Sequence, residues 1–343
     1  MNKNLTFTER FGVVIARMFG GNSLPDKIAV AVSGGADSMA LVFALADYAP
    51  ATQIYALSVD HRLREEAADE AKFVGDVVRK LPNTSHHVLV WEQGDSQDTR
   101  VEEKAREARY GLLYRFMGQN NITHLFVGHH QNDQAETFLF RLAKGSGLDG
   151  LACMLKVSDV LHNGSHFVLC RPLLDEKKSD ILEYVAEHNI SYIEDPSNQD
   201  EAFARVRLRK SMEILSEEGL TPKRLSVTAK RIKRARDAIG YITDVEYKNL
   251  AKSTDTGTIV LESVKLAKQP FEIVVRIILK AMNELKGESG SYGPRLERVE
   301  NLCEDLVAAG QFRKRTLHGI IFEYDVKSGE IVLLLEKPNN PKI

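Results

Sequence analysis

The chain has 343 residues, of which 43% are hydrophobic and 27% are charged, so it is long enough for about two soluble globular domains with well-built cores. Its formal net charge of −2 argues against indiscriminate nucleic-acid binding, so any contact with RNA must come from a local basic patch. The three cysteines, Cys153, Cys170 and Cys303, are far apart and form no CxxC pair, which argues against a disulfide framework or a zinc site and fits a reducing, cytoplasmic environment.

The first predicted element is an amphipathic helix near the N-terminus. Its apolar run, residues 11–16, is flanked by Glu9, Arg10 and Arg17. The run is too short and too charged for a signal peptide or a membrane span. We therefore expect no membrane partner.

The stretch from Ile28 to Ser38 reads IAVAVSGGADS. Apolar residues 28–32 lead into a Ser-Gly-Gly turn, and an apolar helical pattern follows as far as Ala46, so the stretch predicts a strand, a tight turn and a helix. Adjacent glycines allow positive φ and remove Cβ atoms, so backbone N–H groups can approach an anion at the positive end of the helix. The stretch indicates a phosphate-binding loop, and a plain turn with an N-capping serine is the alternative.

Three side chains of this loop indicate that the phosphate binds together with a metal ion. Ser33 and Ser38 add hydroxyl donors, whereas bare phosphate would repel the carboxylate of Asp37. A carboxylate here makes sense chiefly if a Mg²⁺ ion lies between the two. No lysine follows the glycines, which excludes the GxxxxGK[ST] loop of kinases and GTPases, and the stretch is not GxGxxG.

Strands and helices alternate through the first half of the chain and beyond. The expected strands after the first cover 54–59, 87–91, 124–128 and 167–174, and the expected helices cover 65–80, 101–119, 132–144 and 177–188. This alternation predicts an α/β fold with a doubly wound, mostly parallel sheet and helices on both faces. Ligands of such a sheet lie at the carboxyl ends of its strands, which here are rich in polar residues at 33–38, 58–64 and 128–136. If the first and fourth strands are adjacent, the first and last of these segments lie side by side.

The third of these strand ends carries the sequence GHHQNDQAET at 128–137. If a helix begins near Asn132, then Asp133 and Glu136 share one of its faces. Two carboxylates there suit a cationic amine, or they simply complement the helix dipole. Because His129 and His130 point to opposite faces and have no third ligand nearby, we expect them to pack and to hydrogen-bond the loop rather than to bind a metal.

The pattern changes after the α/β region. We place a boundary near residues 215–219 and expect domain 1–215 to be followed by a smaller, mainly helical α+β domain, 216–343. The elements expected in the second domain are a helix from Thr221, a short strand from Gly257, a helix over 272–285 and a hairpin over 315–335.

A basic cluster lies across this boundary. Between residues 205 and 236 the chain has eleven basic residues and three acidic ones. The basic residues are Arg205, Arg207, Arg209, Lys210, Lys223, Arg224, Lys230, Arg231, Lys233, Arg234 and Arg236. Each phosphate that they neutralise adds roughly 0.7 to 0.9 to the salt slope of RNA binding. The cluster predicts a contact with RNA, and a solvated helix face is the alternative.

Seven motifs follow one another over residues 27–209: SGGADS, DHRLR, AREARYGLL, GHHQNDQAET, GSGLDGL, RPLL and EDPSN. In this order they resemble the tRNA(Ile)-lysidine synthetases, which are N-type ATP pyrophosphatases. The resemblance implies a ligase that joins L-lysine to C2 of the wobble cytidine of tRNA(Ile) with a CAU anticodon. ATP adenylates the cytidine with loss of pyrophosphate, and lysine then displaces AMP.

The resemblance also implies roles for single residues. The pyrophosphate of ATP and Mg²⁺ are assigned to Ser33, Gly34, Gly35, Asp37 and Ser38, with Asp37 as the metal ligand. The adenosine is assigned to Ala31, Ser58 and His61. Catalysis is assigned to Asp37, Arg109, Asp133 and Arg205, and lysine binding to Asp133 and Glu136. Contacts with tRNA are assigned to Arg205, Arg207, Arg209, Lys230, Arg231 and Arg234. The EDxSN loop of the family matches Glu194, Asp195, Ser197 and Asn198.

Two positions depart from the family pattern, and two other functions stay open. Asn132 stands where many members have Asp, and Val206 stands where asparagine is frequent. A tRNA thiolase of the same superfamily commonly depends on a CxxC motif and a further cysteine, which this sequence lacks. A non-catalytic nucleotide-binding or RNA-binding module is the alternative from a different class. The sequence does not decide the oligomeric state, and a homodimer stays open.

Overall fold

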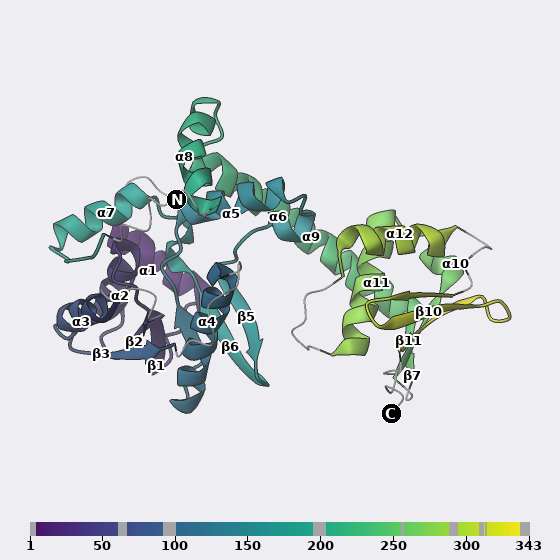
Figure 1. Cartoon of the computed structure of the whole chain (residues 1–343), viewed down its shortest axis with the longest axis horizontal. Helices are drawn as coiled ribbons and strands as arrows, with labels where there is room; N and C mark the ends of the chain where they lie inside the picture. Colours follow the sequence, from purple (N-terminus) through teal and green to yellow (C-terminus); the bar gives the residue numbers. More distant parts are fainter. Residues whose placement is uncertain are drawn as a thin grey trace. The chain divides into compact units, whose positions relative to one another are not determined.

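The computed structural model of the chain describes residues 5–60, 67–91, 101–194, 204–254, 257–287, 294–308, 312 and 314–336, without the side chains of 67–68, 101–105, 204–206 and 254. The chain divides into two units (Figure 1). Unit 1 comprises residues 1–146 and 150–230, and unit 2 comprises 147–149 and 231–343. This division falls within one long helix, and the functional boundary near residue 215 stays a prediction.

Unit 1 is built on a six-stranded sheet with the order β3-β2-β1-β4-β6-β5. Its strands are β1 (Lys27–Ala31), β2 (Gln53–Asp60), β3 (Thr84–Val90), β4 (His124–Phe126), β5 (Val157–His162) and β6 (Ser165–Cys170). All neighbouring pairs are parallel except β5 and β6. The predicted mostly parallel, doubly wound sheet is confirmed, and so is the predicted adjacency of β1 and β4. Strand β5 was not predicted.

Helices connect the strands and cover both faces of this sheet (Figure 1). The helices of unit 1 are α1 (Phe7–Met18), α2 (Ala36–Tyr48), α3 (Ala67–Val78), α4 (Val101–Gln119), α5 (Gln131–Ala143), α7 (Lys178–Glu187) and α8 (Ala204–Glu217), of which α8 packs on α5. Two short helices, α6 (Leu148–Leu151) and the 3₁₀ helix η1 (Pro172–Asp175), lie between them in sequence. Helix α1 is the predicted amphipathic N-terminal helix. Within the described part of the chain, every helix is too short or too polar to cross a membrane.

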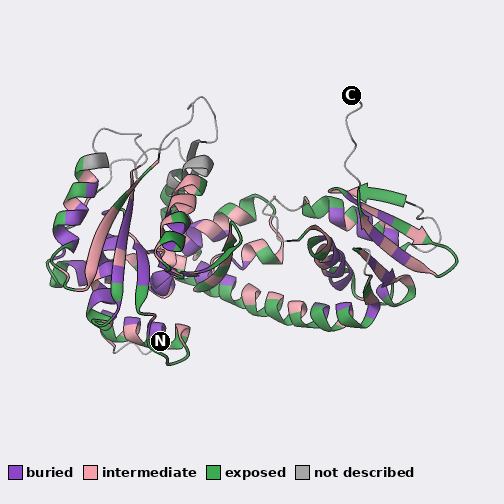
Figure 2. Ribbon diagram, turned by 90° about the horizontal axis from the view of Figure 1, so that it is seen from below, coloured by how far each residue is buried: buried purple, intermediate pink, exposed green. Residues whose placement is uncertain are grey.

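The alternation of side chains along β1 gives the sheet a core on each face. Ile28 and Val30 belong to one buried cluster with Leu41 of α2, whereas Ala29 belongs to a second cluster with Met117 of α4. Successive side chains of a strand point to opposite faces, so a strand covered on both sides has a continuous apolar sequence. Figure 2 shows these central strands as largely buried. The carboxyl ends of β1 and β4 are therefore held firmly side by side.

Unit 2 contains an antiparallel sheet with the order β7-β8-β11-β10-β9. Its elements are β7 (Ala251–Thr254), β8 (Thr258–Glu262), α10 (Ser263–Leu266), α11 (Phe271–Lys286), α12 (Leu296–Val307), β9 (Lys314–Leu317), β10 (Ile320–Asp325) and β11 (Glu330–Leu335), preceded by α9 (Pro222–Leu250). Leu261, Ile278 and Phe322 lie in its core. The smaller α+β region and its hairpin are confirmed, whereas α12 and β7 were not predicted.

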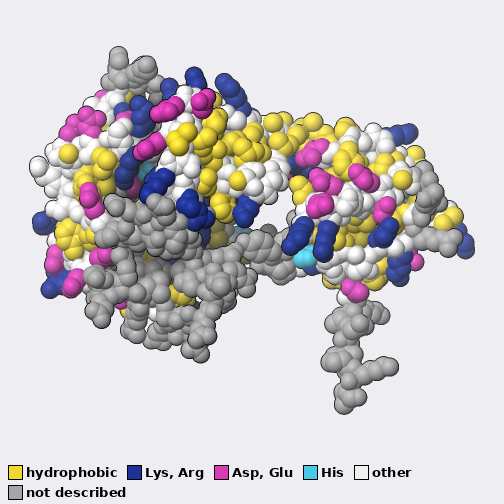
Figure 3. Space-filling view, turned by 45° about the horizontal axis from the view of Figure 1, so that its top comes forward, with side chains coloured by type: hydrophobic (Ala, Val, Ile, Leu, Met, Phe, Trp, Pro, Cys, Tyr) yellow, Lys and Arg dark blue, Asp and Glu magenta, His cyan; other side chains and the backbone are white. Residues whose placement is uncertain are grey.

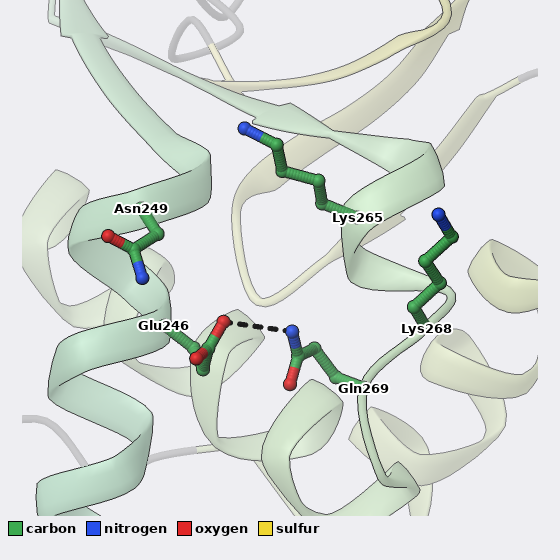
Figure 4. A pocket seen from close by; sticks show the side chains of 5 residues that line it. All are labelled: Glu246, Asn249, Lys265, Lys268 and Gln269. Carbon is green, nitrogen blue, oxygen red and sulfur yellow. Dashed lines mark hydrogen bonds between the residues drawn. The ribbon is translucent and has the colours of Figure 1, made fainter.

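A cavity of about 410 Å³ lies in unit 2. It is lined by Glu246, Asn249, Lys265, Lys268 and Gln269, as Figure 4 shows. Gln269 Nε2 donates to Glu246 Oε2 (2.9 Å), so the acid of the cavity already has a neutral partner. None of the site residues predicted from the sequence lines this cavity.

Candidate active site

The turn between β1 and α2 is closed by the hydroxyl of Ser38. Ser33 N donates to Ser38 Oγ (3.2 Å), and Ser38 Oγ donates to Gly35 O (2.9 Å). Gly35 is the N-cap of α2 and provides no side-chain hydrogen bond. The first N–H groups of a helix have no partner within the helix, so an uncapped N-terminus is a site for an anion. The geometry agrees with the phosphate loop predicted from the sequence.

Gly34 is required for this turn in two ways. Its φ of +89° lies in the region that favours glycine, and a Cβ at this position would lie 2.8 Å from Ile193 Cδ1. Gly34 O also accepts a hydrogen bond from Ile193 N (2.9 Å). The segment that leads into Glu194 therefore rests on the loop. The remaining members of the EDxSN motif, Asp195, Ser197 and Asn198, lie outside the described residues.

Gly128 joins the loop to the end of β4. A Cβ on Gly128 would lie 3.0 Å from the carbonyl carbon and oxygen of Asp37 and 3.1 Å from Ser38 N. These are backbone atoms, so a larger residue would force the end of β4 away from the first turn of α2. Gly128 was predicted as the first residue of this strand end, but its close approach to α2 was not, although a glycine at the end of a buried strand is a signal of such an approach.

Asp37 projects from the first turn of α2 into a cluster of charged groups. Lys178 Nζ lies 2.7 Å from Asp37 Oδ1 and 2.8 Å from Oδ2. His130 Nε2 lies 3.6 Å from Asp37 Oδ2 and 3.6 Å from Asp133 Oδ2. The structure thus brings Asp37 and Asp133 to the same histidine, as the predicted strand adjacency implied. Lys178 was not identified from the sequence.

The position of Lys178 follows from how α7 begins. Arg10 of α1 donates to Glu176 Oε2 from Nε (3.0 Å) and Nη2 (2.8 Å) and to Asp180 Oδ2 from Nη2 (3.0 Å). Gln131 N, at the start of α5, donates to Glu176 O (3.0 Å). The side chain of Glu176 is almost fully buried. These bonds tie the first turn of α7 to both α1 and α5 and so aim Lys178 at the loop.

His130 is the N-cap of α5. Its Nδ1 accepts a hydrogen bond from Asn132 N (3.1 Å), and its own N–H donates to Asp133 Oδ2 (2.8 Å). Because Nδ1 is an acceptor, a neutral ring carries its hydrogen on Nε2, the atom that faces the two carboxylates. His130 is buried, and the predicted hydrogen bond of a histidine to the loop is confirmed. The backbone N–H of His130 thus holds Asp133, while Nε2 lies near both acids.

Glu136 lies one turn after Asp133 and is paired with an arginine. Arg209 Nε of α8 donates to Glu136 Oε1 (2.8 Å), and Nη2 approaches Oε2 at 3.4 Å. Hydrogen bonding to Glu136 raises the pKa of Arg209, and the charges of Glu136, Asp133 and Asp37 raise it further, against a lowering by burial. All three acids therefore act on this guanidinium. Arg209 was predicted to contact tRNA, and in this structure it binds Glu136.

A cavity of about 190 Å³ opens beside this pair. Its lining comes from α5 and α8, and consists of Asn132, Glu136, Arg209, Met212, Glu213 and Ser216. Asn132 contributes its side chain here, while its backbone N–H is bound to His130. The replacement of Asp by Asn at this position therefore changes the charge of the cavity wall and leaves the cap of α5 intact.

The residues predicted to lie near the adenosine have structural roles in β1 and β2. Ser58 Oγ donates to Val32 O (2.8 Å) and lies 2.9 Å from His86 Nε2, and burial lowers the pKa of His86. The Ser58 hydroxyl is thus committed to holding the two strand ends together. Ala31 pairs with Leu57 at the end of β1. His61 lies outside the described residues.

Arg109 lies on α4, at a distance along the chain from the cluster around Asp37. Its guanidinium carbon is 5.8 Å from the centre of the Tyr110 ring, which Arg106 also approaches at 5.3 Å. An arginine held against an aromatic face keeps its charge and its donors. The predicted role of Arg109 in neutralising phosphate stays a prediction.

The predicted tRNA residues lie on α8 and α9. Arg207, Arg231 and Arg234 are exposed, whereas the side chain of Arg205 is outside the described residues. Lys230 Nζ pairs with Asp175 Oδ1 (2.6 Å). Figure 3 shows that basic and acidic side chains are interspersed on one face of the chain, in keeping with its small net charge. The predicted RNA contacts of these residues stay predictions.

The acids around His130 suit Mg²⁺ only in company with phosphate. Mg²⁺ in nucleotide sites commonly takes one or two carboxylates together with phosphate oxygens and water. Asp37 and Asp133 provide two carboxylates next to the uncapped N-terminus of α2. Among the described residues, no group of three or more His, Cys, Asp or Glu forms a metal site by itself. The residues therefore fit an ion that is bound jointly with a nucleotide.

Residues 8–215 match the family model of the PP-loop domain. The chain is 32% identical over 315 residues to the tRNA(Ile)-lysidine synthase of Wolbachia sp. subsp. Brugia malayi. This match covers 91% of this chain and 71% of that protein. It is 35% identical over 317 residues to the tRNA(Ile)-lysidine synthase of Methylobacterium nodulans, with 91% of both chains covered. Identity to the corresponding protein of Rhodopseudomonas palustris is 34% over 340 residues, with 94% of both covered.

Among solved structures, the U34-tRNA thiolase NcsA of Methanococcus maripaludis is similar to this chain. The TM-score is 0.54 at 16% sequence identity, and the match covers 66% of this chain and 77% of the thiolase. At this identity the likeness extends to the fold alone. The function therefore has to be argued from the site and from the relatives of higher identity.

Proposed function

The chain belongs to the tRNA(Ile)-lysidine synthase family, and from this premise we propose that it uses ATP to join L-lysine to C2 of the wobble cytidine of a CAU-anticodon tRNA(Ile). It is a ligase that modifies tRNA and has an ATP-using PP-loop domain. One observation carries the finer proposal. Asp37 of the loop and Asp133 of the acid pair lie at equal distances from His130 Nε2, which supports a proposal in which the sites for nucleotide and amine would adjoin.

The loop between β1 and α2 supports the binding of the β- and γ-phosphates of ATP. The uncapped N–H groups of α2 and the hydroxyl of Ser33 would provide donors, and Lys178 would provide a positive charge, while the Ser38 hydroxyl donates to Gly35 O and closes the turn. Such groups stabilise the negative charge of a departing pyrophosphate. With the two outer phosphates held, the α-phosphorus is open to attack by the C2 oxygen of the cytidine.

Mg²⁺ would be held by Asp37, with Asp133 next to it, and would neutralise phosphate charge when bound. Lys178 now forms an ion pair with both oxygens of Asp37. In the nucleotide complex we expect Lys178 Nζ to exchange this carboxylate for phosphate oxygens. Lys178 is about one third exposed, so its side chain has room to do so.

The acid pair on α5 supports the second half of the reaction. Asp133 and Glu136 would hold the side-chain amine of lysine near the adenylated cytidine. The amine nitrogen forms the bond to C2, the C2–oxygen bond breaks, AMP leaves with the oxygen, and the amine loses a proton. His130 is not the base in its present tautomer, because Nδ1 accepts a hydrogen bond and Nε2 carries the hydrogen. Its role is to position Asp133 through its backbone N–H.

The cysteines argue against a thiolase-like reaction. All three are free and buried. Burial raises the pKa of Cys153 to about 11 and the pKa values of Cys170 and Cys303 to about 12. Because the thiolate is the nucleophile, thiols with such pKa values are inert at neutral pH. The fold that the chain shares with a tRNA thiolase therefore does not bring that chemistry with it.

Product analysis tests the proposed function. The purified chain is incubated with ATP, Mg²⁺, lysine and tRNA(Ile) bearing the CAU anticodon. We expect AMP and pyrophosphate in amounts that depend on the tRNA, and lysine incorporated into the tRNA. Formation of ADP, or no pyrophosphate that depends on tRNA, would contradict the proposal.

A further inference from the structure

The carboxylate assigned to substrate lysine already holds a cation of the chain itself. Arg209 Nε lies 2.8 Å from Glu136 Oε1, and Nη2 lies 3.4 Å from Oε2. A guanidinium and an alkylammonium are both hydrogen-bond donors with a single positive charge. They compete for the same carboxylate oxygens, so Arg209 and a bound amine cannot both have these contacts in full.

The two partners of this ion pair differ in how firmly they are held. The Glu136 side chain is only 7% exposed, on a helix whose start is capped by His130. The Arg209 side chain is 50% exposed. The buried Glu136 carboxylate therefore cannot replace its ion pair by contacts with water, whereas the Arg209 guanidinium can leave the pair and be solvated at once. The fixed member is the acid, and the movable member is the arginine.

The lining of the cavity beside the pair suits an amine with a long aliphatic chain. Met212, which is buried, gives it an apolar wall against which methylene groups can pack. Glu136 lies at its buried side, while Glu213 and Ser216 add polar groups. A ligand with a cation at the end of an aliphatic chain matches this set of groups. The cavity is thus continuous with the place that the Arg209 guanidinium occupies.

We propose that Arg209 occupies the amine subsite on Glu136 in the substrate-free protein and is displaced by the side chain of lysine. This inference rests on the proposed function, since it names the group that lysine replaces. Arg209 is then a selectivity residue, because an amine must reach Glu136 and bind it better than a tethered guanidinium does. A cation that fits the cavity poorly leaves the internal pair in place.

Lysine binding in the absence of tRNA tests the proposal. Titration calorimetry compares the full wild-type chain with Arg209→Ala and Arg209→Lys. Removal of the competitor should lower the Kd for lysine by at least about threefold in Arg209→Ala, the effect expected for loss of a half-exposed ion pair. Arg209→Lys keeps a cation at the same place and should bind lysine as the wild type does. An Arg209→Ala protein with an unchanged or higher Kd overturns the proposal.

Lys210→Ala is the matched control. Lys210 is exposed and is the next residue on α8, so this variant removes the same charge from the same helix. Its Kd for lysine should equal that of the wild type. If Lys210→Ala and Arg209→Ala lower the Kd equally, the effect is one of general charge and the proposal fails.

A second measurement separates displacement from a structural effect of the substitution. In Arg209→Ala, free guanidinium ion should refill the vacated place and raise the apparent Kd for lysine, in a competitive pattern. The wild type at the same guanidinium concentration should show no such change. Absence of competition in the variant counts against the assigned subsite.

These binding assays do not depend on turnover. If wild-type protein forms no tRNA-dependent pyrophosphate, the proposed function fails. If it turns over normally and Arg209→Ala gains no affinity for lysine, only the role of Arg209 fails. In the variant, the gain should also appear as a lower KM for lysine, since the ground-state competitor is gone.

Discussion

Lys178 holds the carboxylate of Asp37 by both oxygens, with Nζ 2.7 Å from Oδ1 and 2.8 Å from Oδ2. The two residues are 141 positions apart in the sequence, on the first turns of α7 and α2. The pair masks an acid that would repel phosphate and keeps a cation beside the phosphate loop.

Replacement of Lys178 by alanine should lower kcat/KM for ATP by at least about 10², because a phosphate clamp of this kind contributes that much or more. The readout is pyrophosphate release that depends on tRNA. Lys178→Arg should retain part of the activity, since it keeps the charge. The neighbouring Lys177 is exposed, and Lys177→Ala should behave as the wild type does. Equal activity of the two alanine variants would show that Lys178 does not contact the nucleotide.

Asp37→Asn removes the carboxylate proposed to bind Mg²⁺ while keeping the size of the side chain. Turnover should fall by at least about 10² if the ion stabilises transferring phosphate. Raising the Mg²⁺ concentration should not restore the rate. A variant with a near-normal rate would rule out a metal ligand at this position. Circular dichroism before the assay confirms that the variant is folded.

Glu136→Gln should weaken the binding of lysine and leave the binding of tRNA unchanged. Loss of a charge-assisted hydrogen bond of roughly 1.5–3 kcal/mol corresponds to an increase in the lysine KM of about 10- to 100-fold. Filter binding should give an unchanged Kd for tRNA. The opposite pattern, weaker tRNA with an unchanged lysine KM, would refute the assignment of Glu136 to the amine.

Gly128→Ala tests the close contact between the end of β4 and α2. The added Cβ would lie 3.0 Å from backbone atoms of Asp37, so it should destabilise the fold by roughly 1–3 kcal/mol and weaken ATP binding. Gly111→Ala is a matched control on α4, because a Cβ there meets nothing within 4 Å. That substitution should raise stability by about 0.5–1 kcal/mol. Urea unfolding and nucleotide titration measure both variants.

The lowered pKa of Asp175 predicts that the protein loses stability in acid. Burial by itself raises its pKa, but Lys156 and Lys230 lower the pKa more, so the native value lies below the usual 3.8. The group then contributes stability that is fully present above about pH 4 and is lost as pH falls through the native pKa. Asp175→Asn should be less stable than the wild type at pH 6, and the difference should shrink below pH 4. A difference that is independent of pH in urea unfolding would contradict this.

The sheet was predictable because its signals are local. Apolar runs such as 28–32 mark strands buried on both faces, and each is followed by a helical period. Strand β5 has no such run. Every second residue of β5 is exposed, and it is a strand only through its antiparallel pairing with β6. An edge strand of this kind is defined by its neighbour, which sequence periodicity does not reveal.

The residues of the candidate site also divide into those that local sequence patterns identify and those that only the fold brings together. Ser33, Gly34 and Asp37 follow from one motif, and Asp133 and Glu136 follow from helical spacing, so both groups could be identified by reading along the chain. Lys178 could not, because nothing near it in the sequence marks it as the partner of Asp37. Charges that meet across the fold are set by the docking of helices, which here depends on Arg10 and Glu176.

The bond from Ile193 N to Gly34 O has a consequence for biosynthesis. The loop proposed to bind the phosphates of ATP is supported by a residue translated some 160 codons after Gly34. A ribosome-bound nascent chain that has emerged only as far as β6 lacks this support for its loop. The newly made protein should therefore become able to bind ATP late, after most of unit 1 has left the exit tunnel.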